Sequence, residues 1–201
     1  LNILATTALA LPAGLEVKNV ETVNLKAGTT ITADTASWTG LNTANVTKAT
    51  DVELNTAATT DVNVSGATGT INVSGGKNVV VNDATANQTI TIGSSSTVTG
   101  VTTETDAAGT ITVTDTKQGT GVINVDGGTD VTITATAAED GTITTTGAIN
   151  VGQTANAILP TGDIKVTQNL EFDGNNAGAT GANLTGGAIT ISGGKTVDVT
   201  V

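Results

Sequence analysis

A short acidic turn, Asp126-Gly127-Gly128-Thr129-Asp130, holds the residues of this sequence best suited to chemistry. Carboxylates, amide oxygens and turn carbonyls are the hard oxygen ligands that Ca²⁺ prefers in proteins. Asp115 and Asp173 lie in other polar stretches and are weaker candidates of the same kind. The turn therefore predicts a calcium site. A plain glycine corner with a solvated Asp fits the same residues and is the simpler interpretation, because Asp favours turns.

The turn is a partial match to the glycine- and aspartate-rich nonapeptide of calcium-loaded β-rolls. Asp130 stands where that pattern has its third glycine, and the equivalent turns carry Asn78 and Thr196 there. Asp126 is replaced by serine in both of these turns. A complete nonapeptide array would repeat its aspartate in every turn, so calcium is predicted for single turns only.

The residue types that carry most enzyme chemistry are missing. The sequence has no His, Cys, Met, Tyr or Arg, and its only aromatic residues are Trp38 and Phe172. General acid–base catalysis most often uses His, and nucleophiles need an adjacent base. Paired carboxylates can cleave glycosidic bonds, but sugar sites also need aromatic or Arg platforms. The composition therefore predicts a protein that is not an enzyme.

Charge excludes further classes of partner. The net charge is -11, and the seven Lys residues are scattered along the chain. Nucleic acid and anionic lipid both require clustered Lys and Arg, so neither is an expected partner. No apolar run approaches the ~20 residues of a membrane helix, which predicts no membrane insertion.

The elements that must position these side chains are short β-strands. Thr and Val account for 45 and 22 of the 201 residues, and both favour strands over helices. Apolar and polar residues alternate in short stretches such as Val62-Asn63-Val64 and Ile123-Asn124-Val125, which is typical of half-buried strands. The predicted class is all-β, a parallel β-helix (β-solenoid) in which Asn and Thr ladders run along the axis. Tandem immunoglobulin-like β-sandwich domains are the alternative, because their closely spaced short strands fit the same pattern.

One strand–corner–strand unit occurs three times, beginning at Gly69, Gly121 and Gly187. Each copy contains a Gly-Gly pair between two strands, and such a unit buries its apolar face only by stacking on others. The interval from Gly69 to Gly121 predicts two coils with three strands each, at about 26 residues per coil. The interval from Gly121 to Gly187 is longer, which predicts a loop insertion at residues 173–186.

Residues 1–15 are the most apolar stretch and are expected to be a lead-in segment or first coil, followed by a solenoid over residues 16–201. This stretch resembles part of a signal peptide but has no basic residue before its apolar run. We therefore expect the chain to be a fragment of a longer protein.

The segment Val17-Lys18-Asn19-Val20-Glu21-Thr22-Val23-Asn24-Leu25 resembles units of large repeat proteins secreted by bacteria, including S-layer proteins and RTX-related proteins exported by type I secretion. The resemblance implies an extracellular location on the bacterial cell surface, calcium-assisted self-assembly, and identical subunits as partners in a lattice or filament. Cell-surface polysaccharide is a further possible partner. The alternative function is a stalk or passenger segment of a secreted adhesin.

Overall fold

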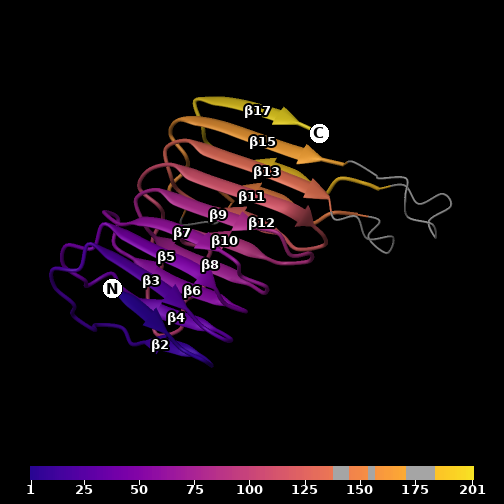
Figure 1. Ribbon diagram of the computed structural model, residues 1–201. Helices are drawn as coiled ribbons and strands as arrows, with labels where there is room; N and C mark the ends of the chain where they lie inside the picture. The colour runs from indigo at the N-terminus through magenta and orange to yellow at the C-terminus, as the bar shows by residue number, and fades with distance from the viewer. Residues whose placement is uncertain (138–144, 154–156, 171–183) are drawn as a thin grey trace.

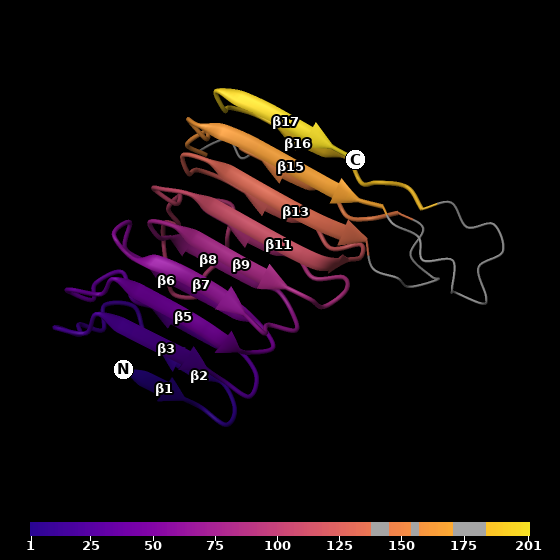
Figure 2. The same ribbon diagram turned by 45° about the horizontal axis from the view of Figure 1, so that its top comes forward.

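The computed structural model describes residues 1–137, 145–153, 157–170 and 184–201, and within them the chain forms two parallel sheets. The chain alternates between the sheets, so each coil contributes one strand to each, and the coils stack in sequence order (Figures 1 and 2). All strand pairings in these residues are parallel, which confirms the predicted β-solenoid and excludes antiparallel sandwich domains.

The odd-numbered strands form the nine-stranded sheet A. They are β1 (Asn2–Leu4), β3 (Thr22–Lys26), β5 (Thr43–Lys48), β7 (Asp61–Ser65), β9 (Val79–Asp83), β11 (Ile111–Gln118), β13 (Val131–Ala137), β15 (Asp163–Asn169) and β17 (Thr196–Thr200). The even-numbered strands form the eight-stranded sheet B. They are β2 (Leu9–Leu11), β4 (Ile31–Asp34), β6 (Val52–Thr56), β8 (Ile71–Gly75), β10 (Ile90–Ile92), β12 (Ile123–Val125), β14 (Ile149–Val151) and β16 (Ile189–Ile191).

The core consists of columns of β-branched side chains, because every second residue of a strand points inward and the register places like on like. In sheet B, Ile71, Ile90, Ile123 and Ile149 are successive register partners, and each is fully buried. Burying one such side chain contributes about 1.5–3 kcal/mol. A solenoid with almost no aromatic residues is therefore stabilised by repetition of small contributions along its axis.

Asn side chains form a ladder on the outer face of sheet A, as predicted. Asn24 donates from Nδ2 to Oδ1 of Asn2 at 2.7 Å, and Asn45 and Asn63 repeat this bond on the next coils at 2.8 and 2.9 Å. Asn24 and Asn45 both donate and accept, whereas Asn2 accepts and Asn63 donates at the two ends of the ladder, which joins four successive coils.

The predicted three-strand coil of constant length is wrong. Each coil has two strands, and the coils differ in length. Val79 of sheet A is the register partner of Val62 on one side and of Ile111 on the other, and Ile111 is almost twice as far away along the chain. The coil from Val79 to Ile111 is longer because residues 93–110 form an insertion between β10 and β11. Most of the loop predicted at residues 173–186 lies outside the described residues, and residues 1–15 contain β1 and β2.

The three Gly-Gly pairs occupy corners that lead from sheet B to sheet A. At Gly127 and Gly128, φ is +83° for both residues, a conformation that L side chains rarely adopt. A Cβ on Gly127 would also overlap Cβ of Asp106, and one on Gly128 would lie 2.9 Å from Cδ1 of Ile111. The glycines therefore serve both the sharp turn and the close approach of the preceding coil.

Candidate functional site

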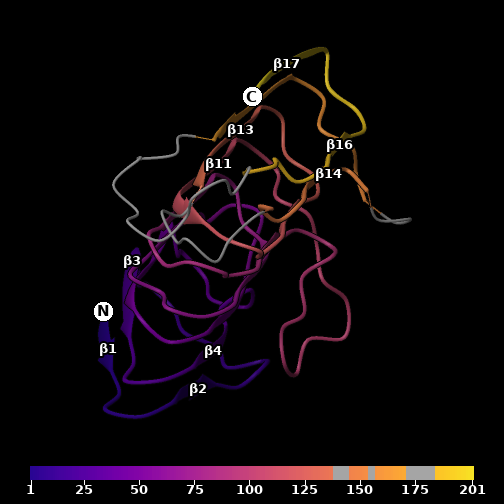
Figure 3. The same ribbon diagram turned by 90° about the vertical axis from the view of Figure 1, so that its right-hand side faces the viewer.

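The insertion of residues 93–110 carries the clearest cluster of polar side chains outside the stack. It leaves after β10 and returns at Thr105, whose carbonyl oxygen accepts a 2.7 Å hydrogen bond from the Gly75 N–H. Between these points it reaches back to β6, where the Thr99 N–H donates to Oε2 of Glu53 at 3.0 Å. Figure 3 shows the insertion projecting from the outline of the coils.

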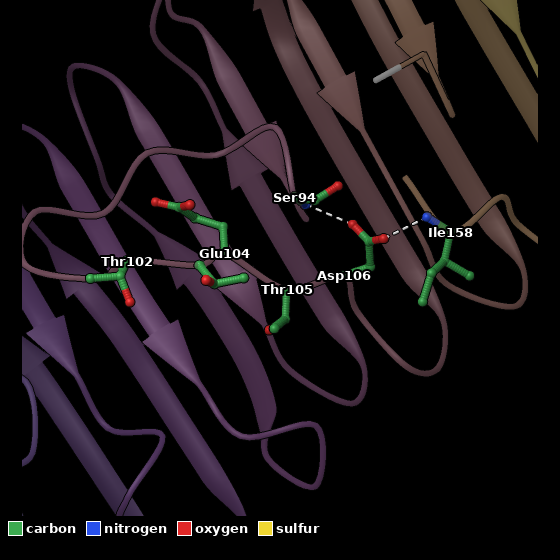
Figure 4. A pocket seen from close by; sticks show the side chains of 7 residues that line it. Ser94, Thr102, Glu104, Thr105, Asp106 and Ile158 are labelled. Atoms are coloured by element: carbon green, nitrogen blue, oxygen red, sulfur yellow. Dashed lines mark hydrogen bonds between the residues drawn. The ribbon is translucent and has the colours of Figure 1, made fainter. Parts of the chain in front are cut away.

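Asp106 clamps the base of this insertion. Its Oδ1 accepts the Ser94 N–H and its Oδ2 accepts the Ile158 N–H, both at 2.6 Å (Figure 4). Ile158 belongs to the connection between β14 and β15, so a single carboxylate joins two long connections. Hydrogen bonds to an ionised acceptor are stronger than those between neutral groups, which makes this clamp a stabilising contact.

An open depression of about 510 Å³ lies beside the clamp. Its lining combines threonine and serine side chains, two carboxylates and one aliphatic side chain: Ser94, Thr102, Thr103, Glu104, Thr105, Asp106 and Ile158. Hydroxyl groups both donate and accept, so this lining offers hydrogen-bonding groups to a polar molecule. The lining includes neither an aromatic ring nor a guanidinium group that would stack on a sugar.

Two carboxyl groups are buried inside the stack. Asp83 on β9 and Asp115 on β11 are register partners, and their exposed fractions are 3% and 2%. Burial raises the pKa of Asp115 to about 7, and the neighbouring Asp83 carboxylate adds to the increase. Burial also raises the pKa of Asp83 above its ordinary value, although the backbone N–H groups of Thr85 and Ala84 oppose the increase.

The structure describes three of the four aspartates that the sequence suggested for calcium, and their surroundings differ. Asp126 is buried beside the Gly127 corner, whereas Asp130 is exposed and its Oδ1 accepts the Asp163 N–H of the next coil at 2.7 Å. Asp115 lies within β11 with Asp83 as its acidic neighbour, and Asp173 falls outside the described residues. The described ranges contain no group of three or more acidic side chains that could hold a metal ion.

The hydrogen bond that Asp130 accepts from the next coil has an equivalent at Asn78. Asn78 accepts the Thr110 N–H of the next coil at 3.0 Å, just as Asp130 accepts from Asp163. A glycine precedes the donor in both cases, and a Cβ on that glycine would overlap the accepting side chain. An Asp or Asn at this position therefore completes backbone pairing between coils, which explains the exchange of Asp for Asn between these repeats without a metal.

Asp83 and Asp106 were not selected from the sequence. For Asp83 a signal existed, because the alternation of Val79 and Val81 continues to position 83 and places a carboxyl group on the inward face. For Asp106 there was none, since its partners Ser94 and Ile158 are 12 and 52 residues away in irregular segments.

Comparison with protein-family models, with curated proteins and with solved structures gives no match for this chain. Among the described residues there is no helix with the length and hydrophobicity of a membrane span.

We expect Asp106→Ala to loosen both connections that the carboxylate joins, because two backbone N–H groups lose their acceptor. The free energy of unfolding should fall by about 2 kcal/mol. Hydrogen exchange followed by mass spectrometry should show faster exchange in peptides around Ser94 and Ile158. Glu104→Ala is the control, because Glu104 accepts only a 3.4 Å bond from the Val98 N–H. Unchanged exchange in Asp106→Ala would contradict the clamp.

Proposed function

We propose that this protein is a self-assembling, non-catalytic structural protein of the bacterial cell surface, similar in role to S-layer proteins. The observation that carries the proposal is the stack of parallel coils, which pair in register along most of their strands. In such a stack each strand pairs only with strands of the adjacent coils, which makes a nearly one-dimensional array, and the insertion of residues 93–110 adds contacts of longer range. The stack provides an extended scaffold whose outer faces carry Asn and Thr side chains.

β17 is an edge strand of sheet A in the described stack. β17 pairs with β15 on one side, and its inward-facing Val197 and Val199 are 51% and 45% exposed. They continue columns that are fully buried at Val131 and Ile133. Exposed strand edges with apolar side chains favour pairing with another strand, which further chain or a neighbouring molecule can supply. Identical subunits are the partners we propose.

We propose that Ca²⁺ assists the contacts between copies and does not bind in the core. Asp130 is exposed, and one of its oxygens is already bonded to the Asp163 N–H. A carboxylate of this kind can contribute to a Ca²⁺ site completed by a second copy. Cell-surface polysaccharide is the second proposed partner, and the hydroxyl-lined depression beside Asp106 supports it.

Negative-stain electron microscopy of the purified chain with Ca²⁺ and with a chelator tests the proposal. Ordered lattices or filaments are expected with Ca²⁺, and chelation should reduce their order. Isolated short rods under both conditions would contradict self-assembly and would favour the alternative, a stalk segment of a secreted adhesin, which needs the same elongated fold. Val199→Lys is a matched variant, because a charge on the exposed edge of β17 should prevent end contacts and leave the fold intact.

A further inference from the structure

Asp83 and Asp115 lie on neighbouring strands inside the stack. Asp83 ends β9, Asp115 is its register partner on β11, and neighbouring strands lie about 4.8 Å apart. Both continue the inward positions of their strands, Asp83 after Val81 and Asp115 after Val113. Two carboxyl groups therefore share one buried level of the solenoid.

Their hydrogen bonds leave one fully buried oxygen without a partner. Oδ1 of Asp83 accepts the Thr85 N–H and Oδ1 of Asp115 accepts the Lys117 N–H, both at 2.9 Å. Oδ2 of Asp83 is buried and makes no hydrogen bond within the described residues. An ionised carboxylate can only accept, so two ionised groups cannot bond to each other, whereas a protonated one can donate.

Few charges face the pair. Ala135 of β13 follows Asp115 in the column, and the sheet B strands β8, β10 and β12 carry no charged side chain. On β11, Lys117 is exposed to solvent, while Asp61 of β7 accepts from Nδ2 of Asn78 at the far end of the strands. The described surroundings thus provide no buried cation to balance two negative charges.

We propose that Asp83 and Asp115 form a proton-binding site that holds one shared proton between β9 and β11, and that loss of this proton weakens the junction between these coils. Two carboxyl groups buried at paired positions of neighbouring strands cannot both ionise without repulsion. The titration belongs to the pair and not to either residue alone. The site is independent of assembly, so it can be tested on dilute, unassembled protein.

The direction of the pH effect follows from the raised pKa values. The folded protein keeps a proton up to about pH 7, whereas an unfolded aspartate loses it near 3.8. The stabilising contribution is therefore complete below about pH 4, declines as the pH rises, and is lost above about pH 7.

Thermal unfolding of the unassembled protein, followed by circular dichroism at pH 5 and pH 8, tests the proposal. We expect the wild type to melt about 5 °C or more lower at pH 8 than at pH 5. Asp115→Asn should remove most of this difference and should melt above the wild type at pH 8, because Asn keeps the acceptor for the Lys117 N–H without a charge. Asp83→Asn should behave in the same way and serves if the first variant does not fold.

Asp34→Asn is the matched control. Asp34 ends β4, and its Oδ1 accepts the N–H of Ala36, two residues further on, at 3.0 Å. Asp83 and Asp115 make the same kind of bond, but Asp34 is only half-buried. This variant should retain the pH difference of the wild type. An equal pH difference in wild type, Asp115→Asn and Asp83→Asn would overturn the shared proton. Ca²⁺ is the second test. If it raised the melting temperature of the wild type at pH 8 but not that of either variant, the shared proton would be overturned in favour of a metal site.

Discussion

Gly121→Ala is expected to destabilise the protein by about 3 kcal/mol, because the added methyl group has no space. A Cβ at this position would overlap the backbone carbonyl of Gln88 on the preceding coil. Backbone cannot move aside as a flexible side chain can, so the two coils must separate, and overpacking of this kind typically costs about 1–3 kcal/mol or more. Gly147 and Gly187 make the same approach to the coils before them, so the contact is a repeated one.

Urea unfolding monitored by circular dichroism would measure this loss. Gly100→Ala provides the comparison, since no other heavy atom lies within 4 Å of its Cβ position. Its φ of +88° leaves only backbone strain, about 1–2 kcal/mol. If Gly121→Ala were no less stable than Gly100→Ala, the close stacking at the start of the sheet B strands would be wrong.

Ile123→Ala is expected to lower the free energy of unfolding by about 2–5 kcal/mol. Ile123 is fully buried between its register partners Ile90 and Ile149, so truncation leaves a cavity between coils that hydrogen bonds hold at a fixed spacing. The loss includes both the apolar surface no longer buried and the cavity that remains.

The matched control for this truncation is Ile158→Ala. Ile158 is 66% exposed, and its structural contribution is the backbone N–H that Asp106 accepts, which alanine retains. We expect a change within about 0.5 kcal/mol. Equal losses for the two variants, measured by chemical unfolding, would show that the core column does not carry the stability assigned to it.

Local patterns predicted the strands but not the length of a coil. Alternation placed Ile71 and Val73, or Ile123 and Val125, on the buried face, because a strand turns successive side chains to opposite faces. The predicted constant coil length was wrong because the Gly-Gly pairs mark only every second coil. The unmarked coil between the first two pairs contains the insertion of residues 93–110. Dividing the interval between the pairs by two therefore concealed that one coil is longer than the other.

For the candidate sites too, local patterns predicted burial but not contacts between coils. Burial of the Asp115 carboxyl follows from its place after Ile111 and Val113 in one alternating strand, but its pairing with Asp83 depends on the register between two strands far apart in the sequence. The clamp at Asp106 depends on the path of an irregular segment, which no periodicity describes. Contacts between coils require the coil lengths, and the insertion makes these lengths irregular.

The unequal coils also have a mechanical consequence. Hydrogen bonds between coils run along the stack, so a force applied to its two ends pulls coils apart in turn and does not shear whole sheets past each other. The short coil from Val62 to Val79 releases roughly 60 Å of chain when it opens. The longer coil from Val79 to Ile111 releases about 110 Å. The stack would thus extend under load in steps of two sizes, and each opening dissipates work before the chain is fully extended.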